Sequence, residues 1–175
     1  GLSRKLERMS VEEGAAYLKK TYGLEETPEE IARATLKIVE DFYFYEAPLK
    51  PGVREYLDEL KARKIPMVIA TSSVRAHVEA ALRRLGVLDY FAKVFTCSEV
   101  GAGKTKPLIY ERAGAYIGGD FREIAVFEDA IHALETAKQA GFYTVAVYDP
   151  SAGKDWDRLK KEADVAVTDM RQLMI

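Results

Sequence analysis

Short apolar runs rich in β-forming residues alternate with amphipathic helix patterns through most of this chain. The runs lie at residues 66–70, 94–97, 124–127 and 144–147, with a weaker one at 165–167. Strands separated by helical segments are typical of a parallel sheet, because parallel neighbours need a long crossover connection. The sequence therefore predicts an α/β fold with a parallel sheet.

The first part of the chain has a helical pattern instead. Ser10 and Glu13 have the spacing of a helix capping box, and Thr27 before Pro28 marks a second helix start. Residues 41–46 read DFYFYE. Aromatic residues at helical spacing are more often buried against a neighbour than exposed as a ligand platform, so we expect burial, against this chain or a partner.

Composition excludes several classes of function. The 175 residues are 48% hydrophobic and 31% charged, enough for one proper core. A net charge of -2, with scattered Lys and Arg, predicts no nucleic-acid partner. No apolar stretch could span a bilayer, and the opening residues lack the apolar core of a signal peptide, so we expect a cytoplasmic protein without a membrane partner.

Few soft metal ligands are available in this sequence. Cys97 is the only cysteine, and His77 and His132 are the only histidines. No zinc-type cluster can be built from them, so any bound metal is expected to be hard and oxygen-liganded.

Hydroxyl residues follow the first predicted strand. Thr71, Ser72 and Ser73 stand just before a helix expected to start near Val74. Helix N-termini present unpaired N–H groups and a partial positive charge, so this segment can form a phosphate seat. An equally good reading is that the hydroxyls only cap the helix.

Two lysines follow the second predicted strand, after a glycine-rich turn. Lys104 or Lys106 could neutralise a phosphate or a carboxylate at the strand ends, although a solvated surface lysine is the more common case. Gly103, Lys104 and Thr105 also resemble half of the phosphate-binding loop of nucleoside triphosphatases. That motif needs a glycine where Ser98 stands, so we keep it only as an alternative.

An adjacent acidic pair, Glu128 and Asp129, ends the third predicted strand. Like charges repel, and a cation between them would relieve the repulsion. Two carboxylates suit Mg²⁺, which takes one or two protein carboxylates together with water and phosphate oxygens. The alternative is that Asp129 caps the next helix and Glu128 is solvated. Asp149, at the fourth strand end, is interpreted as a turn residue.

Together, the segments TSS, KTKPLIY and VFEDAIHALETAKQAGF resemble the second, third and fourth motifs of the haloacid dehalogenase-like hydrolases. The similarity is to the branch with β-phosphoglucomutase and phosphoglycolate phosphatase-like enzymes. It implies a Rossmann-like hydrolase core over residues 49–175 and a partial α-helical cap over residues 1–48.

The resemblance also implies roles for the site residues. Thr71, with the backbone at Ser72, would bind the transferring phosphate, and Ser73 would belong to the same substrate-binding segment. Lys104 would be the motif lysine, with Lys106 as the fallback, although Thr105 replaces the usual proline and Leu108 the usual aspartate. Glu128 and Asp129 would hold Mg²⁺.

The family's first motif, Asp-x-Asp-Gly-Thr at the end of an apolar strand, does not occur in these residues. That motif supplies the nucleophile and the general acid/base. We therefore expect the first core strand to be missing, the chain to be an incomplete and inactive portion of a longer protein, and either self-association or an N-terminal segment to complete the sheet.

The expected function is that of a magnesium-dependent phosphatase acting on small phosphorylated metabolites. A phosphosugar mutase of the β-phosphoglucomutase type is the first alternative. The mutases carry an Arg directly after the serine that corresponds to Ser10, and Val11 stands there instead, which favours a phosphatase. A non-catalytic interaction module is the remaining alternative.

Overall fold

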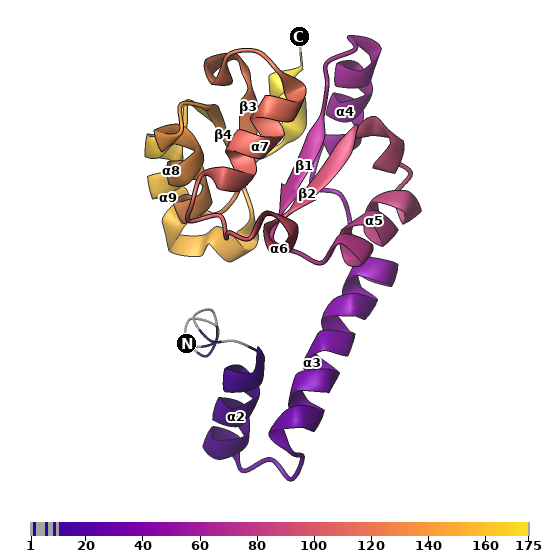
Figure 1. Cartoon of the computed structure of the whole chain (residues 1–175), viewed down its shortest axis with the longest axis vertical. Coiled ribbons are helices and arrows are strands. Elements are labelled where there is room, and N and C mark those ends of the chain that lie inside the picture. The colour runs from indigo at the N-terminus through magenta and orange to yellow at the C-terminus, as the bar shows by residue number, and fades with distance from the viewer. Residues whose placement is uncertain (1, 3–5, 7–8, 10, 175) are drawn as a thin grey trace. The chain divides into compact units, whose positions relative to one another are not determined.

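The computed structural model describes residues 2, 6, 9 and 11–174 of the chain (Figure 1). It divides into two compact units, Gly1–Ala47 and Pro48–Ile175. None of the helices in the described ranges is both long and apolar enough to cross a membrane.

In the smaller unit, the described residues include helices α2 (Val11–Tyr22) and α3 (Pro28–Asp41), followed by a π-helical turn (Phe42–Glu46). The predicted helix start at Thr27 is confirmed. The Thr27 hydroxyl accepts a hydrogen bond from the Glu30 N–H at 3.2 Å, and the Glu30 carboxylate accepts one from the Thr27 N–H at 2.8 Å. The predicted capping box at Ser10 lies outside the described residues.

The aromatic stretch of residues 42–46 is only partly buried. Phe42 is 46% exposed and Tyr45 is 71% exposed, so these two side chains are not buried against the described residues of this chain, and their burial against a partner stays a prediction. Phe42 and Tyr43 pack edge to face with ring centroids 6.1 Å apart. The helices and the turn that the structure describes in this unit supply no second layer that could cover every face of such a stretch.

The larger unit contains five strands, all parallel to their neighbours, as predicted. Strand β1 (Val68–Thr71) pairs with β2 (Lys93–Thr96), so that Thr71 lies opposite Thr96. A separate sheet has the order β3 (Ala125–Glu128), β4 (Tyr143–Val147) and β5 (Val165–Val167). The predicted single sheet is therefore two sheets, interrupted between β1 and β3.

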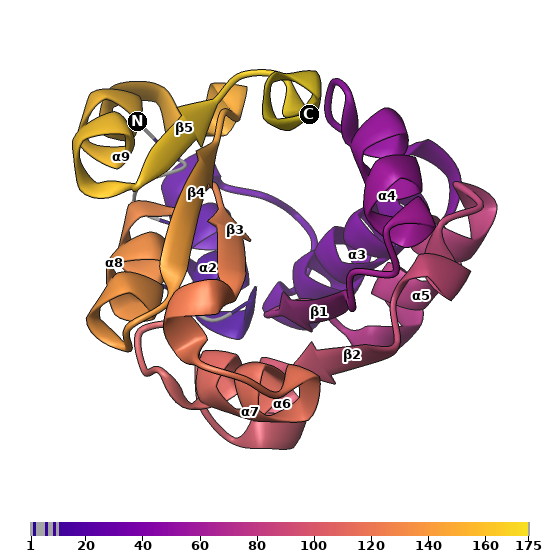
Figure 2. The same cartoon turned by 90° about the horizontal axis from the view of Figure 1, so that it is seen from above.

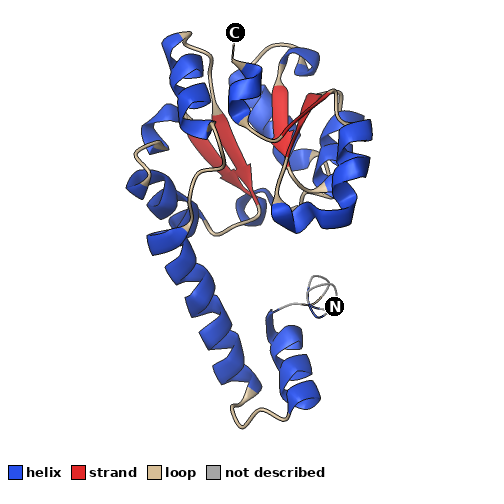
Figure 3. Cartoon of the chain, turned by 180° about the vertical axis from the view of Figure 1, so that it is seen from behind, coloured by secondary structure: helices blue, strands red, loops and turns tan. Residues whose placement is uncertain are grey.

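Helices connect the strands, as the alternating pattern predicts (Figure 3). Their bounds are α4 (Val53–Ala62), α5 (Arg75–Arg84), α6 (Cys97–Val100), α7 (Leu108–Ile117), α8 (Ile131–Gln139) and α9 (Trp156–Glu162). Helices α8 and α9 cover the outer face of the β3–β5 sheet (Figure 2). Leu134, Ala146 and Leu159 from these layers have no exposed surface and form one core cluster.

Helix α7 holds the two sheets together. Its residues Ile109, Tyr110 and Ala113 form one buried cluster with Phe95 of β2 and with Phe142. Partly buried residues of β1 and β3 pack against the same cluster: Val68, Ala70 and Val126. Apolar packing across α7 therefore replaces backbone pairing between β1 and β3.

A cavity lies along the interruption of the sheet. In the described part of the chain, β1 pairs only with β2 and β3 only with β4, so each keeps one unpaired edge. Figure 2 shows β1 and β3 apart, with no strand drawn between them. The cavity has a volume of about 640 Å³, and its lining, mostly apolar, includes Val68, Ile69, Ala70, Val126, Phe127, Glu128, Tyr56, Leu57, Ala113 and Ile117.

The turn before α4 depends on glycine at position 52. Gly52 has φ 72°, and a Cβ atom there would lie against the Asp169 carboxylate and 2.7 Å from the Arg171 backbone nitrogen. The Met170 N–H also donates to the Pro51 carbonyl at 2.9 Å. The turn therefore packs directly against the C-terminal 3₁₀ turn (Met170–Leu173).

We predict that Gly52→Ala is more destabilising than Gly101→Ala. Gly101 has φ 78° but no atom within 4 Å of an added Cβ, so its substitution isolates the backbone penalty of about 1–2 kcal/mol. Gly52→Ala adds an overpacking penalty of about 1–3 kcal/mol. Urea unfolding of both variants measures the difference, and equal losses of stability would contradict close packing at Gly52.

Candidate functional site

The structure brings Lys104 and Glu128 together, although they lie in separate segments. Lys104 belongs to the loop after α6, and Glu128 is the last residue of β3. The Lys104 ammonium contacts the Glu128 carboxylate at 2.6 Å, with side-chain exposures of 18% and 7%. The surface-lysine alternative is therefore wrong for Lys104, whose partner is a buried charge at a strand end.

Tyr110 completes this contact. Its hydroxyl donates to the Glu128 oxygen that also binds Lys104, at 2.8 Å, and the residue is 2% exposed. Burial, followed by the negative charge of Glu128, raises the Tyr110 pKa well above its ordinary value. The hydroxyl thus stays protonated and acts as a donor.

A second lysine, Lys50, neutralises the other half of the acidic pair. The Lys50 ammonium lies 3.3 Å from the Asp129 carboxylate and also pairs with Asp149. Each member of the Glu128–Asp129 pair therefore has its own lysine partner. The expectation that a cation relieves their repulsion is met here by two ammonium groups, and Mg²⁺ binding by the pair stays a prediction.

The alternative interpretation of the acidic pair is wrong. Helix α8 is preceded by Ala130 and has no side-chain cap, so Asp129 does not cap it. Glu128 is buried and not solvated. Asp149 does cap the following 3₁₀ turn, since its carboxylate accepts a hydrogen bond from the Ser151 N–H at 2.8 Å. The turn role predicted for Asp149 is confirmed, and its contact with Lys50 is additional.

The hydroxyl segment lies at the end of β1. The Thr71 hydroxyl accepts a hydrogen bond from the Ser73 N–H at 3.0 Å, and the Ser72 hydroxyl lies 3.5 Å from the Cys97 sulfur. Helix α5 begins at Arg75 without a side-chain cap, so these hydroxyls do not cap it. The phosphate seat stays a prediction for these residues.

Lys106, the fallback lysine, has a different environment from Lys104. It is exposed and forms no ion pair within the described residues. Lys104 is thus the lysine that the tertiary structure directs toward the acidic pair.

The donor set suits a magnesium ion but is small. In the described residues, no group of three or more His, Cys, Asp or Glu side chains could hold a metal. Glu128 and Asp129 supply hard carboxylate oxygens, and 43% of the Asp129 side-chain area is exposed. Because Mg²⁺ usually takes few protein carboxylates and keeps several waters, two such ligands fit this ion.

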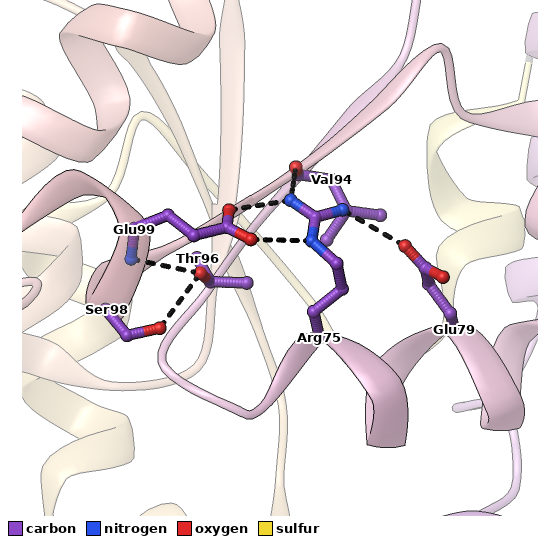
Figure 4. A network of polar contacts seen from close by, with 6 residues as sticks. All are labelled: Arg75, Glu79, Val94, Thr96, Ser98 and Glu99. Atoms are coloured by element: carbon purple, nitrogen blue, oxygen red, sulfur yellow. Dashed lines mark hydrogen bonds and ion pairs between the residues drawn. The ribbon is translucent and has the colours of Figure 1, made fainter.

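A polar network ties the loop that carries Lys104 to the start of α5 (Figure 4). The Arg75 guanidinium donates to both Glu99 carboxylate oxygens, at 2.7 and 2.6 Å. It also donates to the Val94 carbonyl at 2.7 Å and to Glu79 at 3.0 Å. Glu99 belongs to α6, immediately before the lysine loop, so Arg75 fixes the base of that loop relative to the hydroxyl segment.

Sequence reasoning missed Lys50 and Tyr110. Tyr110 ends the KTKPLIY segment, and a buried tyrosine hydroxyl generally needs a hydrogen-bond partner, which is a usable signal. No local pattern identifies Lys50, since its partner Asp149 is 99 residues away along the chain.

Residues 5–141 match the family model for the haloacid dehalogenase-like hydrolases. This span contains the hydroxyl segment, Lys104, Glu128 and Asp129. The match argues against the nucleoside triphosphatase alternative, for which the sequence has only half of a motif.

Several curated relatives have names that refer to phosphate chemistry. The chain is 31% identical to validoxylamine A 7'-phosphate phosphatase of Streptomyces hygroscopicus subsp. limoneus, over 70% of this chain and 55% of the relative. It is 35% identical to the phosphorylated carbohydrates phosphatase of Thermotoga maritima, over 52% of this chain and 42% of the relative. It is 32% identical to the β-phosphoglucomutase of Bacillus subtilis, over 57% and 43%. The chain spans about half the length of the curated relatives it matches.

Solved structures share the fold. A Thermotoga maritima protein provisionally described as a β-phosphoglucomutase matches with a TM-score of 0.77 and 27% identity, covering 98% of this chain and 80% of that one. A β-phosphoglucomutase from Clostridium difficile matches with a TM-score of 0.67 and 18% identity, covering 99% and 77%. The Rossmann-like α/β fold is thus confirmed.

We predict that Tyr110→Phe destabilises the protein by about 1.5–3 kcal/mol, because a hydrogen bond to a buried charge is lost. Tyr116→Phe is the matched control, since Tyr116 is 51% exposed. Chemical denaturation measures both variants. A Tyr110→Phe protein as stable as the control would contradict the importance of this hydrogen bond.

We predict that Arg75→Ala loosens the lysine loop, seen as faster amide hydrogen exchange in residues 97–106. Hydrogen bonds from Arg75 lower the Glu99 pKa from 4.5 to about 2. A lowered carboxyl pKa gives stability that is present above pH 4.5 and is lost as the pH falls toward 2. The exchange difference between wild type and variant should therefore shrink over that range.

Arg122→Ala is the control for this prediction. Arg122 likewise lowers the Asp120 pKa to about 2, but this pair lies outside residues 97–106. Equal exchange in that segment for wild type and Arg75→Ala at neutral pH would contradict the positioning role of Arg75.

Proposed function

The chain belongs to the haloacid dehalogenase-like hydrolases, and we propose that its site serves a magnesium-dependent phosphatase acting on small phosphorylated metabolites. The observation that carries this proposal is the buried contact between Lys104 and Glu128 at the carboxyl ends of the strands, 2.6 Å long. Ligand sites of parallel α/β sheets lie at this edge. The phosphatase names of several relatives agree with the proposal.

Each residue of the site has a separate proposed task. The Thr71 hydroxyl and the Ser72 N–H bind oxygens of the transferring phosphate, and the Lys104 ammonium faces the negative charge that develops there. Glu128 and Tyr110 hold Lys104 in place through one shared carboxylate oxygen. Glu128 and Asp129 would hold Mg²⁺, which would supply additional positive charge to stabilise the phosphoryl group.

The cavity between β1 and β3 is proposed to bind an extended strand from outside residues 1–175. Both of its walls carry an unpaired parallel strand edge, and its lining is mostly apolar. Four residues pair in each neighbouring strand, so the occupant needs about four residues, or about 13 Å at the usual rise. Glu128 lines the cavity at the end where this strand would finish.

The occupant is proposed to carry a carboxylate just past its apolar segment. Phosphoryl transfer through a covalent intermediate requires a nucleophile. The proposed nucleophile would lie beside the cations and hydroxyl groups of the described site. The family's first motif provides an aspartate just past an apolar strand. No segment of this sequence resembles that motif. The chain alone would then be inactive.

A second copy of this chain fits the cavity less well than a separate strand. The occupant must have both edges free, because it would pair with β1 on one side and β3 on the other. Each of the five described strands already pairs with a neighbour. Self-association through this cavity is therefore disfavoured.

Hydrolysis is favoured over a mutase reaction by one sequence feature. Val11 follows Ser10 where the mutases have an arginine that holds a second phosphate. The names of the relatives include both activities, and Ser10 lies outside the described residues. Product analysis distinguishes the two reactions.

We predict that the 175-residue chain alone has negligible activity with a sugar monophosphate and Mg²⁺. A synthetic peptide with a four-residue apolar segment followed by Asp-x-Asp-Gly-Thr should bind the chain and release inorganic phosphate. The same peptide with its first Asp replaced by Asn should bind without releasing phosphate, because the nucleophile is absent. Phosphate assay and calorimetry measure these effects.

The possible results separate the parts of this proposal. Failure of both peptides to bind would contradict the strand site. Binding of the Asp peptide without turnover would contradict the phosphatase and favour an interaction module. Isomerised sugar phosphate as the product would favour the mutase. Strong turnover by the chain alone, lost in Glu128→Ala, would show that no added strand is needed.

A further inference from the structure

Lys50 joins two strand ends that carry negative charge. Its ammonium pairs with Asp149, after β4, and lies 3.3 Å from the Asp129 Oδ2 atom, after β3. It also donates to the Tyr148 carbonyl at 3.4 Å. We propose that Lys50 is a positioning residue that clamps Asp129 and Asp149 together and acts as a built-in counter-cation for Asp129.

The backbone around Lys50 is held firmly, so the clamp has a defined position. The Lys50 carbonyl accepts the Val53 N–H at 3.2 Å at the start of α4, and the Pro51 carbonyl accepts the Met170 N–H at 2.9 Å. Gly52 packs closely against Arg171. Only 33% of the Lys50 side-chain area is exposed. Because the backbone is already fixed, pairing costs Lys50 side-chain freedom but little further backbone freedom.

The two carboxylates hold Lys50 unequally. Asp149 is fixed by the Ser151 N–H and is 28% exposed, and it makes the closer contact with the ammonium. Asp129 is 43% exposed and contacts the ammonium through one oxygen at the longer distance. Asp149 is thus the anchor of the clamp, and Asp129 keeps surface that a second cation can reach.

This arrangement predicts that removing Lys50 and removing Asp149 have opposite effects on cation binding at Asp129. This step rests on the proposed metal site. The positive charge of Lys50 beside a ligand oxygen opposes a divalent cation at Asp129. Removing Lys50 should strengthen Mg²⁺ binding, whereas removing the anchor Asp149 should direct Lys50 toward Asp129 and weaken it.

We predict that Lys50→Met lowers the Mg²⁺ dissociation constant about tenfold and that Asp149→Asn raises it by a similar factor. Calorimetric titration of the 175-residue chain with Mg²⁺ at constant ionic strength measures both. Lys160→Met and Asp157→Asn are the matched controls, because they remove the same charges from another ion pair, 2.8 Å long, on α9. The control substitutions should change the Mg²⁺ dissociation constant by less than about twofold.

A second measurement needs no metal. In buffer with a chelator, a double-mutant cycle of Lys50→Met and Asp149→Asn on unfolding free energy should give a larger coupling than the cycle of Lys160→Met and Asp157→Asn. The pair at Lys50 is less exposed than the pair on α9, so solvent screens it less.

The outcomes distinguish this inference from the proposed function. No excess coupling in the chelator would overturn the clamp. Excess coupling with Mg²⁺ bound by none of the variants would leave the clamp standing and refute the metal site. Mg²⁺ binding that is unchanged in Lys50→Met, or strengthened in Asp149→Asn, would overturn the role of Lys50 as counter-cation of Asp129.

Discussion

The buried carboxylate of Glu128 is the constraint on which the rest of the site depends. A charge that is 7% exposed costs several kcal/mol unless it is paired and hydrogen-bonded. Lys104 and Tyr110 meet this need through the same oxygen atom, from a loop and from α7. The lysine loop, α7 and the end of β3 thus meet at one carboxylate oxygen. Arg75 supports the same loop from its base.

Charge at the strand ends is balanced by protein groups. Lys104 faces Glu128 and Lys50 faces Asp129, so the adjacent carboxylates coexist without an added cation. A cation that binds there must share these carboxylates with ammonium groups. The proposed Mg²⁺ would therefore be held weakly by the protein alone, because Mg²⁺ usually takes few protein carboxylates and completes its shell with water and substrate oxygens.

The interrupted sheet divides the core into two halves joined by apolar packing across α7. The cluster around Ile109 and Tyr110 contacts residues of β1, β2 and β3. The cavity along the break contains strand edges whose N–H and C=O groups have no strand partner in the described residues. Open edges of this kind favour the binding of another strand. The cavity and the candidate site share Glu128, which is one of the residues that line the cavity.

The sequence by itself determined the parallel α/β class, the helix start at Thr27, the approximate position of each strand and the family. These properties depend on periodicity, capping residues and motif spacing, which act over a few residues. Only the tertiary structure decided that the sheet is interrupted, that Tyr110 binds Glu128, and that Lys50 pairs with Asp149, 99 residues away. The physical reason is that a charge takes its partner from whichever strand ends and loops the packed fold places beside it, and no local pattern encodes that choice.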